Sequence, residues 1–73
     1  MKMLARLRYL IDEGFEVLSI CGYDDETGKN NARLMFVENH GGSRRVHSEI
    51  FDVQTEEMER CADLFLEHHS RRE

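Results

Sequence analysis

Two stretches of the chain repeat apolar residues at the spacing of an α-helix. In the first, they fall at i, i+1, i+4, i+7 and i+8: Met3, Leu4, Leu7, Leu10 and Ile11. In the second, between Thr55 and His69, they fall at i, i+3, i+4, i+7 and i+11: Met58, Cys61, Ala62, Phe65 and His69. The pattern predicts helices over Met3–Glu13 and Glu56–Ser70. Gly14 is placed to end the first in a left-handed conformation, and Thr55 to cap the second.

Three strands are predicted between these helices, because β-branched and aromatic residues recur there and residues typical of turns separate them. We assign them to Phe15–Tyr23, Ala32–Glu38 and Arg45–Val53. The alternation in the third is imperfect, since Val46 and Ile50 have one parity while Phe51 and Val53 have the other. We expect a bulge near Ile50 to reconcile them.

The element order predicts an α+β fold in which residues 1–73 form one small domain with two layers, α-β-β-β-α. Because the turns are short, the sheet is expected to be a three-stranded antiparallel meander with both helices on one face. A chain of this length buries only about 60–65% of its unfolded surface and is stabilised little by its core alone. The predicted core is Leu4, Leu7, Ile11, Leu34 or Met35, Phe36 or Val37, Ile50, Met58, Ala62 and Phe65.

Acidic residues exceed basic ones by 15 to 10, which gives a formal net charge of −5. This favours solubility and disfavours nucleic acid or anionic lipid as the main partner. The acids concentrate in the turn at Asp24, Asp25 and Glu26 and on the polar side of the last helix, at Glu56, Glu59, Asp63 and Glu67. Such a stripe also arises on any solvated helix. Because the chain has few other features that could carry a function, we predict that these residues bind a protein with a basic surface.

Leu64 lies off the apolar side of the last helix, between Arg60 and His68. An exposed leucine there suits a contact between two protein chains. We therefore predict weak homodimerisation through Leu64 and its surroundings, or through an open sheet edge.

No motif that carries out chemistry is present. Cys21 and Cys61 lie in apolar contexts typical of buried free thiols, and a single bridge between them is the less favoured alternative. The close ligand pairs of zinc sites, a phosphate loop and an activated nucleophile are lacking. We predict no enzymatic activity, no metal and no cofactor. No stretch has the ~20 apolar residues of a membrane span, and we expect a reducing, cytoplasmic location.

The element order resembles that of the double-stranded RNA-binding domain over nearly the whole chain. That family places a run of lysines at the start of its second helix, whereas this chain has Thr55-Glu56-Glu57-Met58-Glu59 there. Glutamates repel phosphates, so nucleic acid is not the expected partner. An RNA-binding module led by Arg44, Arg45 and Lys29, with His47 close by in sequence, is the alternative hypothesis.

A second resemblance rests on residues 23–65. Its elements are Tyr23 with the acids that follow it, Gly28-Lys29, Ala32-Arg33, Val37-Glu38-Asn39, Phe51-Asp52, and Thr55-Glu56 opening a helix. In these features the chain resembles small phage-encoded inhibitors of CRISPR effectors. The resemblance implies stoichiometric binding to a basic nucleoprotein surface, without chemistry.

Overall fold

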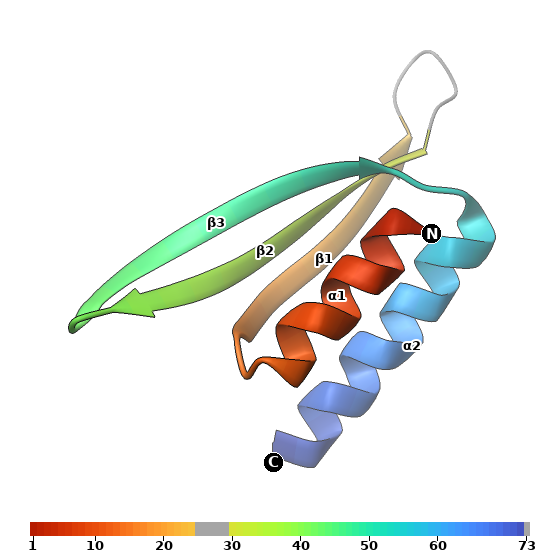
Figure 1. Ribbon diagram of the computed structural model, residues 1–73. Helices are drawn as coiled ribbons and strands as arrows, with labels where there is room; N and C mark the ends of the chain where they lie inside the picture. Colours follow the sequence, from red (N-terminus) through yellow and green to blue (C-terminus); the bar gives the residue numbers. More distant parts are fainter. Residues whose placement is uncertain (25–29, 73) are drawn as a thin grey trace.

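The elements follow in the predicted order in a computed structural model that describes residues 1–24 and 30–72. They are α1 (Lys2–Asp12), β1 (Glu16–Asp24), β2 (Asn30–His40), β3 (Ser43–Asp52) and α2 (Thr55–Arg72). The strands form one antiparallel sheet in the order β1-β2-β3. Both helices lie side by side on one face of this sheet, and β3 is the strand farthest from them (Figure 1). The predicted α+β class and its two layers are confirmed.

α1 ends where the sequence predicts, at a glycine. Gly14 has a φ of +84°, which a side chain would disfavour. Its N–H donates to the carbonyl of Ile11 at 3.1 Å, and the N–H of Phe15 donates to that of Leu10 at 2.9 Å. This is the Schellman pattern, which satisfies carbonyls of the last turn and directs the chain into β1.

A second pair of glycines sets the β2–β3 turn. Gly41 and Gly42 have φ values of +52° and +90°, and they separate His40 from Ser43, which pair across the hairpin. Positive φ at both positions is the signature of a type I′ turn, whose twist matches that of the flanking strands. The register of β2 with β3 then runs without interruption to Asn31 and Asp52.

The core lies between the two helices and the sheet face that they cover. Its buried members are Met3, Leu7, Leu10, Val17, Ala32, Leu34, Phe36, Val53 and Cys61. Partly buried side chains pack against them: Leu4, Ile11, Phe15, Ile20, Phe51, Met58, Leu64 and Phe65. Of the predicted core, Ala62 is half-buried and Ile50 is the clear exception.

Ile50 is 57% exposed, so its assignment to the core is wrong. The predicted bulge near it is also wrong, since the β2–β3 register is continuous and the irregularity lies in β1, between Val17 and Ser19. The physical reason is that the helices cover only one sheet face. Phe51 points to the covered face, whereas Val46 and Ile50 lie on the open face.

One side chain on the open face is nevertheless buried. Val37 is 1% exposed, although its sheet parity is opposite to that of the core residue Phe36. Its cross-strand neighbours are Glu16 and Val46. Arg44 on β3 forms an ion pair with Glu16 on β1, with Nη2 of Arg44 and Oε2 of Glu16 3.1 Å apart. This ion pair spans β2, the strand that carries Val37.

A buried carboxylate joins the two helices. Glu57 is 7% exposed, and its Oε2 accepts the backbone N–H of Leu4 at 3.2 Å. α1 begins at Met1 without a side-chain cap of its own, so α2 supplies the acceptor. Both helices start at the same end of the molecule (Figure 1), and a negative charge there suits both helix dipoles.

A second polar contact joins α1 to β3. The guanidinium of Arg6 donates to both carboxylate oxygens of Glu49 at 3.0 Å and lies over the rings of Tyr9 and Phe36. Bidentate pairing fixes direction better than a single contact. The pair of Arg6 and Glu49 therefore orients β3, the strand that the helices cover least.

Substitutions on the two sheet faces test their assignment. We expect Leu34→Ala to lower the free energy of unfolding by about 2–5 kcal/mol, because it leaves a cavity in the core. Ile50→Thr should change it by less than about 0.5 kcal/mol, because the side chain is already in water. Urea denaturation measures both. Equal losses would contradict the one-sided core.

Replacing Glu57 tests the shared cap. We expect Glu57→Ala to lower the free energy of unfolding by about 1–2 kcal/mol, because the backbone N–H of Leu4 in the first turn of α1 loses the carboxylate that accepts its hydrogen bond. Glu56→Ala is the matched control, being an exposed carboxylate in the same helical turn. If the two variants melt alike, Glu57 is not a cap.

Candidate protein-interaction surface

The four acids predicted on α2 share its exposed side. Glu56, Glu59, Asp63 and Glu67 are all exposed, and the helical repeat places them together. Leu66, 62% exposed, stands three residues after Asp63 and seven after Glu59. We call these five residues the outer face of α2. It combines an apolar side chain with carboxylates that lie along one side of it.

Two arginines neutralise part of this face. Arg60 pairs with Glu56 at 3.7 Å, and Arg71 pairs with Glu67 at 2.6 Å, both one helical turn apart. Among the side chains that the structure describes, Glu59 and Asp63 have no cationic partner. These two carboxylates therefore present their charge to solvent.

Leu64 is not exposed as predicted. It is partly buried and packs against the core. With Leu4 and Arg8 of α1 it lines a groove between the helices, where Arg60 and Asp63 of α2 also lie. Since α2 contacts α1 as well as the sheet, its buried arc is wider than one apolar stripe. The exposed leucine is Leu66, and the dimer contact predicted at Leu64 lacks its premise.

The predicted acidic turn can be followed only in part. Asp24 is the last residue of β1, where it pairs with Asn30. Asp25 and Glu26 lie outside the described residues, as does Lys29 of the alternative RNA-binding hypothesis. The structure thus brings together the acids of α2 and places Asp24 at the end of β1.

The basic residues of the alternative hypothesis stand among carboxylates. Arg44 is paired with Glu16, while Arg45 is exposed. The Glu38 Oε1 atom lies 3.1 Å from the Nε2 atom of His47 and 3.3 Å from that of His40. The hydrogen bond with His47 is the main cause that lowers the pKa of Glu38. The Glu38 carboxylate thus keeps its negative charge beside His47 and opposite Arg45, which is unfavourable for phosphate.

The two cysteines are both free, and they differ in environment. Cys61 is buried as predicted. Desolvation, and then the charge of Glu57, raise its pKa to about 11. A thiol at that pKa is almost entirely protonated at neutral pH, and thus a poor nucleophile. Cys21 is exposed, contrary to the prediction, because it lies on the open face opposite Arg33.

The histidines of α2 are more enclosed than expected for surface residues. His68 and His69 are half-buried, and their Nε2 atoms are buried without a hydrogen-bond partner. The His69 ring packs edge-on against Phe65, with centroids 4.3 Å apart. Across residues 1–24 and 30–72, no three His, Cys, Asp or Glu side chains are grouped as metal ligands.

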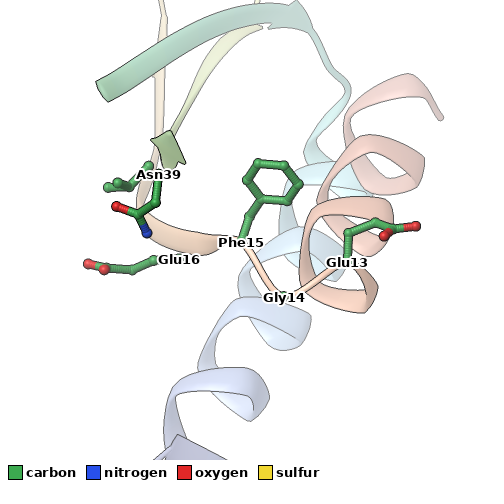
Figure 2. A pocket seen from close by; sticks show the side chains of 6 residues that line it. Glu13, Gly14, Phe15, Glu16 and Asn39 are labelled. Atoms are coloured by element: carbon green, nitrogen blue, oxygen red, sulfur yellow. The ribbon is translucent and has the colours of Figure 1, made fainter. Parts of the chain in front are cut away.

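The depression at the α1–β1 connection does not form a paired-carboxylate site. It has a volume of about 330 Å³ and is lined by Glu13, Gly14, Phe15, Glu16, Val37 and Asn39. Figure 2 shows the Glu13 and Glu16 side chains pointing in opposite directions, so the two carboxylates do not converge on one point. General acid–base chemistry of the two-carboxylate type requires that convergence.

Comparison with known proteins found no matching family model, no matching curated protein and no matching solved structure. Neither described helix is long and apolar enough to cross a membrane.

The two thiols provide a test of the site description. In the native protein we expect one thiol, Cys21, to react rapidly with iodoacetamide at mildly alkaline pH, and Cys61 to react only after denaturation. Mass spectrometry of digested protein identifies the labelled residue. In the control variant Cys21→Ser, rapid labelling should vanish. Fast labelling of native Cys61 would show that its surroundings open readily.

Proposed function

We propose that this protein is a non-enzymatic interaction module that binds a basic protein surface through the outer face of α2. The observation that carries the proposal is the exposure of Leu66 beside the unpaired Glu59 and Asp63. An apolar contact surrounded by charged groups is the usual anatomy of a protein interface, where the centre supplies affinity and the rim supplies orientation.

The electrostatic part of binding follows from the ion pairs of α2. Glu56 and Glu67 already have arginine partners, so the net attraction comes mainly from Glu59 and Asp63. Complementary charge increases the association rate and sets the docking direction more than it adds affinity. Binding should therefore weaken as ionic strength rises, since salt screens exposed charges.

The narrower form of the proposal is a cytoplasmic, stoichiometric inhibitor of a basic nucleoprotein. Its support is the sequence resemblance of residues 23–65 to phage-encoded inhibitors of CRISPR effectors, together with the net charge of −5. In this form the acids at Asp24, Asp25 and Glu26 add to the contact. A protein that acts by occupying a surface needs no nucleophile, metal or cofactor.

Charge reversal on α2 tests the proposal. In a pull-down from host lysate treated with nuclease, we expect Glu59→Lys/Asp63→Lys to weaken capture of the partner by about tenfold or more, equivalent to roughly 1.4 kcal/mol. Asp12→Lys/Glu13→Lys is the matched control, because it makes the same charge change at two exposed acids near the end of α1. Leu66→Ala should also weaken capture, and with less dependence on salt.

Arg44→Glu/Arg45→Glu distinguishes the RNA-binding alternative. If nuclease abolishes every interaction and this variant does the same, while reversal at Glu59 and Asp63 has no effect, the protein-binding proposal is wrong. If the variant of α2 and its control lose capture equally, the effect is one of net charge and the outer face of α2 is not the site.

A further inference from the structure

β3 is an edge strand that contains neither a proline nor a bulge, although it carries charged side chains. The other edge strand, β1, is interrupted by the irregularity at Val17 and Ser19, whereas β3 pairs with β2 in unbroken register from Ser43 to Asp52. The chain contains no proline. A long, regular edge presents unpaired backbone groups that can pair with another strand.

The turn geometry identifies which backbone groups face outward. A two-residue type I′ turn makes its flanking residues, His40 and Ser43, a hydrogen-bonded pair, and such pairs alternate along an antiparallel ladder. The odd-numbered residues of β3 therefore bond to β2. The N–H and C=O groups of the even-numbered ones point to the open edge: Arg44, Val46, Ser48, Ile50 and Asp52.

We propose that β3 pairs antiparallel with β3 of a second copy, about a twofold axis at Ser48, to give one six-stranded sheet. The side chains of β3 are self-complementary in this register. On the open face, Arg44 stands opposite Asp52 of the second copy, Val46 opposite its Ile50, and Ser48 opposite itself. On the covered face, His47 stands opposite Glu49 and Arg45 opposite Phe51. Within its own chain, His47 contacts Glu38, and Glu49 pairs with Arg6. Opposite charges and apolar pairs across strands stabilise a ladder.

Neighbouring registers lack this match. In every hydrogen-bonded register, an even-numbered residue of one β3 faces an even-numbered residue of the other. Moving from one such register to the next therefore changes the partner of each residue by two positions. A shift one way keeps an opposite-charge pair, Arg45 with Glu49, but it places Arg44 opposite Ile50 and Val46 opposite Ser48, so the apolar pair is lost. A shift the other way places Glu49 opposite Glu49, and like charges directly opposite are destabilising. The joint pattern of charged and apolar residues thus favours the register centred on Ser48, and it favours a second copy over an unrelated strand.

The pairing also covers apolar surface. Val46 and Ile50 are 56% and 57% exposed in the single chain, and each gains an apolar cross-strand neighbour in the dimer. One added strand is a small interface, so the dimer is weak and depends on concentration. The sequence predicts a homodimer that forms either through Leu64 and its surroundings or through an open sheet edge. Because Leu64 is partly buried, the present proposal uses the sheet edge.

Cysteine cross-linking tests the register directly. In a Cys21→Ser background, Ser48→Cys places two thiols at the axis. Directly opposite Cα atoms of a hydrogen-bonded pair are about 5.5 Å apart, within the range for a disulfide. We expect rapid formation of a covalent dimer under mild oxidation. Ser43→Cys is the matched control, an exposed serine of the same strand, and should cross-link much more slowly.

Three further variants test the dimer without cross-linking. Val46→Pro removes an N–H that points to the open edge, so it should abolish association in sedimentation experiments while the circular dichroism of the fold remains. Asp52→Lys should weaken association by opposing Arg44, and Arg44→Glu/Asp52→Lys should restore it. A monomer at every concentration, association unaffected by Val46→Pro, or equal cross-linking of both cysteine variants would overturn the proposal. None of these substitutions alters α2, so the outcome is independent of the proposed partner binding.

Discussion

The parallel arrangement of the two helices is the constraint on which the other features depend. Both N-termini lie at one end, so two positive dipole ends meet there, and the Glu57 carboxylate is buried next to them with the N–H of Leu4 as its donor. This position of Glu57 turns Cys61 and Leu64 towards α1, since they follow at helical spacing. The same rotation brings Leu66 to solvent among the carboxylates of α2. An internal contact therefore decides the composition of the outer face.

One-sided coverage is the second consequence. Because both helices occupy the same sheet face, β3 keeps an open face and an open edge, and only the pair of Arg6 and Glu49 links it to α1 by hydrogen bonds that the structure describes. The described residues form two helices, and since both lie on one face of the sheet, neither covers the other face (Figure 1). The apolar residues Val46 and Ile50 then remain exposed unless another molecule covers them.

The sequence predicts what depends on local periodicity and misses what depends on contacts between elements. The helices, the three strands and the helix end at Gly14 follow from spacing and turn chemistry and are confirmed. The errors at Ile50 and Leu64 share a cause: which face of a strand or helix is buried depends on the elements that cover it, and spacing along the chain does not carry that information. Glu57 could have been recognised only by its spacing, since Glu57, Cys61, Leu64 and His68 repeat at i, i+4, i+7 and i+11. In this chain the glutamate at the start of that stripe meets the first turn of α1.

The two proposed surfaces would act together in a defined geometry. A twofold axis that continues a sheet through an edge strand is perpendicular to that sheet, so both copies carry their helices on the same face of the six-stranded sheet. Two outer faces of α2 would then point to one side of the dimer. A partner with two basic sites, or two partners held side by side, would be bound with an effective concentration set by a rigid sheet. Weak pairing of β3 would increase the apparent affinity for such a partner without any additional contact on α2. This increase would disappear in Val46→Pro, whereas the affinity of each single site would stay the same.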